Sequence, residues 1–109
     1  MTKANFILNN EKKPYAFRIS GHAEYGNYGE DIVCSGITTA TFTTLNLIDK
    51  LSNNNINNDY TLIQDEYKGL IDFKLNKIDE LSLLIIQNLL EILTNIEEQY
   101  PQNLKIIIK

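Results

Sequence analysis

The chain changes from strand to helix within residues 21–36, GHAEYGNYGEDIVCSG. This segment holds the only histidine (His22), the only cysteine (Cys34) and four of the five glycines. Alternating residues before it predict a half-buried strand that ends at Gly21. Apolar residues at helical spacing after it predict a helix that carries Cys34 in its first turn. The segment is therefore either a cysteine-hydrolase site or an ordinary turn between a strand and a helix.

The rest of the chain alternates pairs of strands with helices. Hydrophobic periodicity predicts two helices, one from Asp31, a favourable N-cap residue, to Leu51, and one over 79–100. It also predicts strands over residues 4–9, 15–20, 60–64, 70–75 and 104–108. The first two strands are expected to pair antiparallel through the turn over residues 9–14. This order favours an α+β fold of two layers, in which two helices pack on one face of a mostly antiparallel sheet.

The second predicted helix has an unusually wide apolar face. One set of apolar residues recurs at spacings of three and four: Ile78, Leu81, Ile85, Leu89, Ile92 and Ile96. A second set widens the face beyond what contact with one sheet requires: Leu83, Ile86, Leu90 and Leu93. Two explanations are equally good. The helix is either a deeply covered core element or part of a homodimer interface, formed by this helix or its neighbours.

Length and composition set limits on the function. The 109 residues, 43% of them apolar, suit one domain over residues 1–109. A net charge of −4 argues against a general nucleic-acid binder and is compatible with a basic peptide partner. One cysteine forms no internal disulfide and makes a zinc site improbable, so we expect no metal and no cofactor. No apolar stretch reaches the length of a membrane span or a signal region, which predicts a soluble cytoplasmic protein.

Cys34 and His22 are the candidate chemical groups. Cysteine attacks as its thiolate, which the positive end of a helix and a neighbouring imidazolium both stabilise. Free N–H groups of the same helix turn could receive an oxyanion, and His22 could pass a proton to a leaving amine. Asp31 could orient His22 or cap the helix. However, a lone cysteine is most often a small buried hydrophobe, so spacing alone favours the structural interpretation.

The segment resembles the signature of the ribosomal-processing cysteine protease family (Prp) of bacteria. In that family a GHA motif, here residues 21–23, and a DIVC motif, here residues 31–34, flank a glycine-containing loop. The resemblance extends to the chain length, the leading hairpin and both helices. It implies a small cytoplasmic homodimeric endopeptidase that removes a short N-terminal extension from a large-subunit ribosomal protein precursor.

The resemblance also implies a role for each site residue. Cys34 would be the nucleophile, His22 the general base and acid, and Asp31 an orienting or structural residue. The substrate-covering loop would comprise Ala23, Glu24, Tyr25, Gly26, Asn27, Tyr28, Gly29 and Glu30. The chain departs from the family at Ser35 and Gly36, where small apolar residues are more usual. Glycine inside a helix costs about 1 kcal/mol relative to alanine, which puts the start of this helix in question.

A non-catalytic function is the competing hypothesis. The small size and the possible dimer face also fit a ribosome-assembly or ribosomal-protein binding factor with a structural thiol. Such a protein would bury Cys34, and its thiol would react with alkylating agents no faster than an ordinary cysteine.

Overall fold

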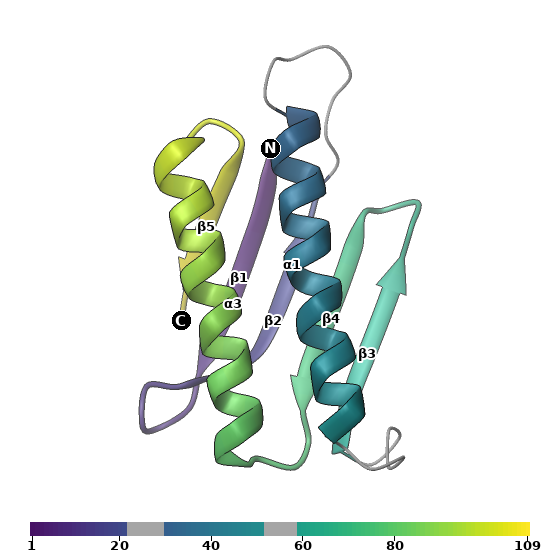
Figure 1. Ribbon diagram of the computed structural model, residues 1–109, viewed down its shortest axis with the longest axis vertical. Coiled ribbons are helices and arrows are strands. Elements are labelled where there is room, and N and C mark those ends of the chain that lie inside the picture. Colours follow the sequence, from purple (N-terminus) through teal and green to yellow (C-terminus); the bar gives the residue numbers. More distant parts are fainter. Residues whose placement is uncertain (22–29, 52–58) are drawn as a thin grey trace.

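Five strands and two helices make up the described part of the computed structural model, which comprises residues 1–21, 30–51 and 59–109 (Figure 1). The strands are β1 (Thr2–Leu8), β2 (Pro14–Ser20), β3 (Tyr60–Asp65), β4 (Leu70–Leu75) and β5 (Leu104–Ile108). The helices are α1 (Glu30–Leu51) and α3 (Glu80–Gln99). Figure 1 shows both helices on the same face of the sheet. The predicted two-layer α+β fold is confirmed.

The strands form one mostly antiparallel sheet in the order β3-β4-β2-β1-β5. β1 and β5 are parallel, and the other three neighbouring pairs are antiparallel. The predicted antiparallel pairing of the first two strands is confirmed, with Phe6 opposite Phe17. β1 begins two residues earlier than expected, because Thr2 already pairs with Leu104 of β5. Pairing between strands, which periodicity along one strand does not report, therefore sets its start.

A row of aromatic rings crosses the sheet within the core. The ring centroids of Phe6 and Phe17 are 5.7 Å apart, and those of Phe17 and Phe73 are 5.1 Å apart. Tyr60 continues the row from β3, at 5.3 Å from Phe73. Such offset or tilted pairs add about 0.5–1.5 kcal/mol each to the stability that burial supplies. The row therefore connects β1, β2, β4 and β3 on the face of the sheet that the helices cover.

α3 begins after Asp79, whose side chain accepts a hydrogen bond of 2.8 Å from the Ser82 backbone N–H. The structure corrects the predicted core face of this helix. The second apolar set supplies most of the core, because Leu83, Ile86 and Leu93 are buried together with Leu89. Three residues of the first set are exposed instead: Ile78, Leu81 and Ile92. Both sets have helical spacing, so only packing against the sheet could choose between them.

α1 begins at Glu30, so Asp31 lies inside its first turn and is not the N-cap residue that the sequence predicted. The helix continues without interruption through Gly36. A β-carbon built on Gly36 would meet the Ile96 side chain of α3 at 3.6 Å, an ordinary van der Waals distance. Alanine would therefore also fit at this position, and Gly36 does not break α1. Leu51, the last residue of the predicted helix, also ends α1 and is exposed.

Candidate active site

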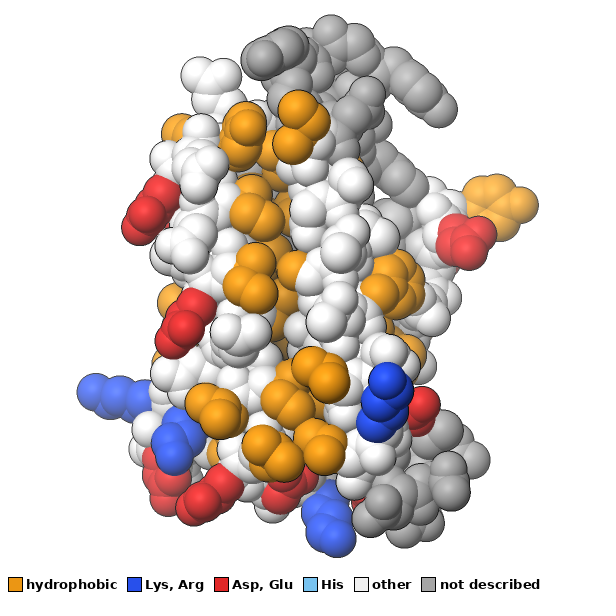
Figure 2. Space-filling view, in the orientation of Figure 1, with side chains coloured by type: hydrophobic (Ala, Val, Ile, Leu, Met, Phe, Trp, Pro, Cys, Tyr) orange, Lys and Arg blue, Asp and Glu red, His pale blue; other side chains and the backbone are white. Residues whose placement is uncertain are grey.

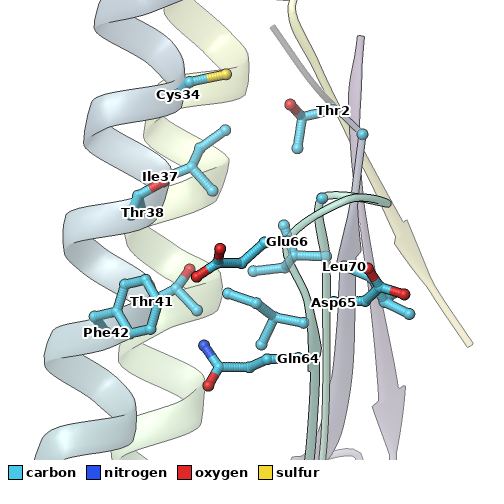
Figure 3. A pocket seen from close by; sticks show the side chains of 14 residues that line it. Thr2, Cys34, Ile37, Thr38, Thr41, Phe42, Gln64, Asp65, Glu66 and Leu70 are labelled. Atoms are coloured by element: carbon cyan, nitrogen blue, oxygen red, sulfur yellow. The ribbon is translucent and has the colours of Figure 1, made fainter.

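Cys34 lies on α1, on the side of the helix that faces the sheet (Figure 3). It is a free, partly buried cysteine and the fifth residue of the helix, one position beyond the first four residues because α1 begins at Glu30 and not after Asp31. Side chains on a helix tilt toward its N-terminus, so the sulfur lies over the first turn. Unpaired N–H groups and the positive end of the helix dipole are found there. The thiol thus occupies a position at which negative charge is electrostatically favoured.

Gly21 brings the end of β2 to the same site. Its backbone φ is +115°, and a β-carbon at this position would lie 2.6 Å from the Met1 carbonyl oxygen. Only glycine satisfies both the conformation and the space. The Gly21 N–H also donates a hydrogen bond of 3.2 Å to the Gly69 carbonyl oxygen. These constraints hold the chain at the point where it leaves the sheet toward His22.

A cleft of about 520 Å³ separates α1 from the ends of β2, β3 and β4. Both Gly21 and Cys34 line it, so the structure brings the residue before His22 and the cysteine to one cavity. Ile37 and Leu70 supply apolar wall. Figure 3 shows the cleft running along α1 away from Cys34. Its size and mixed lining suit several residues of an extended peptide.

Several lining residues were missed by the sequence analysis. Thr41 and Phe42 line the cleft from α1, and Gln64 and Glu66 line it from the end of β3 and the following turn. A signal was available for Thr41, because it follows Cys34 and Thr38 at helical spacing and therefore shares their face. No local pattern could have found Glu66, because it is brought to the cleft by the strand order.

Three further predictions concern residues that the structure describes only in part or not at all. His22 and residues 23–29 of the predicted covering loop lie outside the described residues. Glu30, the last residue assigned to that loop, belongs to α1, because the helix begins there. Asp31 is placed by its backbone in the first turn of α1. The pairing of His22 with Cys34 and the role of Asp31 therefore stay predictions.

The described residues offer neither a metal site nor a membrane-spanning helix. No group of three or more His, Cys, Asp or Glu residues among them is arranged to hold a metal ion. Within the same residues, neither helix combines the length and apolar character that crossing a membrane requires.

An α+β fold with a thiol at the start of a helix, in a cleft of peptide size, is the arrangement of a small cysteine protease. A profile of the family described as cysteine protease Prp matches residues 1–105. The chain therefore belongs to the Prp family of cysteine proteases.

Individual relatives agree with this assignment. The ribosomal processing cysteine protease Prp of Staphylococcus aureus strain Mu50 is 31% identical over 112 residues, which cover 100% of both chains. A crystal structure of the S. aureus protease with a substrate peptide superposes with a TM-score of 0.85, at 28% identity over 100% of both chains. A second, with a covalently linked product peptide, gives a TM-score of 0.84 at 29% identity, again over 100% of both chains.

Proposed function

We propose that this protein is a cytoplasmic cysteine endopeptidase that removes the N-terminal extension of a large-subunit ribosomal protein precursor. The observation that carries the proposal is the meeting of Cys34 and Gly21, from the two halves of the family motif, in one cleft. The S. aureus relatives are named as ribosomal processing proteases and bind a substrate peptide and a covalently linked product peptide. A single domain over residues 1–109 would carry the whole activity.

In the proposed mechanism His22 takes the proton from Cys34, and the thiolate attacks the scissile carbonyl carbon. The tetrahedral oxyanion is stabilised by backbone N–H groups at the start of α1. His22 then protonates the leaving amine as the C–N bond breaks, which leaves a thioester on Cys34. A water molecule deprotonated by His22 attacks the thioester, and the C–S bond breaks to restore the thiol. Asp31 would orient His22, and residues 23–29 would cover the bound peptide.

The cleavage test uses the purified protein, the ribosomal protein precursor and mass spectrometry of the products. The unmodified protein should release one N-terminal fragment, and Cys34→Ala should slow its release by at least about a thousandfold, because the nucleophile is gone. Ser35→Ala is the matched control, since it removes the exposed neighbouring hydroxyl and should leave cleavage unchanged. Cleavage that survives Cys34→Ala would refute the proposed nucleophile. An uncleaved precursor together with slow alkylation of Cys34 would favour a non-catalytic binding factor.

We also propose that the protein acts as a homodimer. Figure 2 shows apolar side chains gathered along the boundary between α1 and α3. They line a second groove of about 520 Å³ that includes Leu47, Leu84 and Ile92. Leu84, which lines this groove, is 61% exposed, and exposed apolar residues gathered in one patch often mark an interface. A second copy could cover this groove by a two-fold axis, with the same helices meeting from each side.

A further inference from the structure

Thr41 carries a buried hydroxyl on the part of α1 that lines the cleft. Its relative exposure is 0%, and its Oγ1 has no hydrogen-bond partner among the described residues. Threonines inside helices commonly donate to the carbonyl one turn back. Here Thr43 donates to the Thr39 carbonyl at 2.7 Å, and Thr44 to the Ala40 carbonyl at 2.9 Å. Thr41 makes no such bond and lies on the side of α1 that lines the cleft (Figure 3).

Opposite Thr41, the turn after β3 supplies a negative charge. Figure 3 shows the Glu66 side chain extending from the sheet side toward α1, whereas Asp65 points away from the helix. Glu66 forms no ion pair within the described residues, and neither lysine nor arginine is among the described residues that line the cleft. A carboxylate here therefore keeps its full capacity to accept hydrogen bonds from a ligand.

The walls between these two polar groups are apolar. Ile37 and Phe42 line the cleft from α1, and Leu70 and Ile71 from β4. Lysine and arginine have this same division, because a long apolar stem carries a charged head. Phe42 could also contact the cation through the face of its ring.

We propose that this end of the cleft is a specificity subsite for a lysine or arginine side chain of the peptide substrate. The cationic head would donate hydrogen bonds to the Glu66 carboxylate and to Thr41 Oγ1, and the stem would lie against Ile37 and Leu70. The inference rests on the proposed function, since it assumes that the occupant of the cleft is the peptide to be cut. It adds to that function the class of side chain that the protein selects.

The position of the basic residue follows from the helix geometry. Thr41 lies seven residues beyond Cys34, a rise of about 10 Å along α1. An extended peptide advances about 3.3 Å per residue. The lysine or arginine should therefore lie about three residues from the scissile bond.

Peptide binding to the Cys34→Ala protein tests the subsite without cleavage. Fluorescein-labelled peptides tiled across the N-terminal region of the precursor would be made in matched versions with lysine, norleucine or glutamate at each position. Anisotropy should show lysine binding about fivefold more tightly than norleucine at one position, as a single partly exposed ion pair allows, and glutamate binding weakest. Equal affinities for lysine and norleucine at every position, or no binding by any peptide, would overturn the proposal.

Variants of the cleft residues test which side chains cause the preference for lysine peptides. In the Cys34→Ala background, Glu66→Gln should abolish the preference for lysine and Thr41→Val should reduce it, whereas Thr41→Ser should retain it. Glu98→Gln, at an exposed residue of α3 outside the cleft, makes the same change in net charge and should have no effect. A lysine preference that persists in Glu66→Gln, or that Glu98→Gln removes equally, would show a general attraction to an acidic protein and refute the subsite.

The two proposals fail in different ways. If the unmodified protein cuts the precursor but shows no preference for lysine, the subsite is wrong and the protease function stands. If Cys34→Ala selects lysine peptides but the unmodified protein cuts none, the subsite stands and the endopeptidase function is wrong. In a protein that does cut, Glu66→Gln should raise KM for the lysine peptide more than it lowers kcat, because the residue binds substrate without touching the reacting atoms.

Discussion

Three residues set the candidate site, and each does so for a different physical reason. Cys34 is the nucleophile candidate, and its position near the start of α1 places the sulfur close to the positive end of the helix dipole, which favours negative charge. Gly21 is required by a positive φ and by the close approach of Met1. Thr41 is a buried polar group without a hydrogen-bond partner among the described residues, which is expected where a protein keeps a binding group ready at the cost of stability.

The stability that the buried Thr41 hydroxyl costs can be measured with the variant Thr41→Val. The substitution removes a buried, unpartnered hydroxyl and replaces it with a methyl group of similar size, so the free energy of unfolding should rise by about 1 kcal/mol. Urea denaturation followed by circular dichroism measures the change. Thr44→Val is the matched control on the same helix, because the Thr44 hydroxyl donates to the Ala40 carbonyl and its loss should bring no gain. Equal or greater destabilisation by Thr41→Val would contradict our account of the hydroxyl.

At the scale of elements, the position of α1 over the sheet determines the shape of the cleft. The C-terminal end of α1 is attached to the sheet by a hydrogen bond of 3.3 Å that Tyr60 Oη of β3 donates to Asp49 Oδ1. Burial raises the pKa of Tyr60 above its usual 10.0, and the charge and hydrogen bond of Asp49 raise it further. The pair joins the last turn of α1 to the start of β3.

The raised pKa of Tyr60 predicts how the stability contributed by the Tyr60–Asp49 pair changes at high pH. Because the folded protein holds the phenolic proton more tightly, the unfolded chain loses its proton first as the pH rises through 10.0. The stability that this pair contributes is therefore fully present below that pH and is lost as the pH rises through the folded-state value. Tyr60→Phe should be less stable than the unmodified protein at about pH 8, and the difference should shrink by about pH 11.

Urea unfolding of both proteins across this pH range measures the effect. A stability difference that stays constant with pH would contradict the assigned shift.

At the scale of the whole molecule, exposed apolar side chains line the groove between α1 and α3. The other face of the sheet carries the cross-strand ion pair of Arg18 and Asp72, whose Nη2 and Oδ2 atoms are 2.7 Å apart, and also exposes Ile63. The helical face exposes Leu47, Leu81 and Leu84. The groove lined by Leu47, Leu84 and Ile92 is the physical basis for proposing a two-fold dimer through the helices.

Light scattering after size-exclusion chromatography tests the dimer at micromolar concentration. The unmodified protein should have twice the mass of the chain, and Leu84→Lys should shift it to the monomer, because a charge would be buried in the interface. Ile63→Lys is the control, since Ile63 is 53% exposed on β3, away from the groove. A monomer mass for the unmodified protein would refute the dimer, and equal dissociation by both variants would refute this interface.

Local chemistry along the sequence determined the element order, the α+β class and the motif that contains His22 and Cys34. Strands and helices with a regular hydrophobic pattern can be predicted from the sequence, because their side chains alternate between core and solvent within one element. Only the tertiary structure decided which stripe of α3 faces the core and that α1 begins at Glu30. It also decided that Thr41 and Glu66 line the cleft of Cys34. These properties depend on contacts between elements far apart in the chain, and such contacts leave no periodic trace in either segment alone.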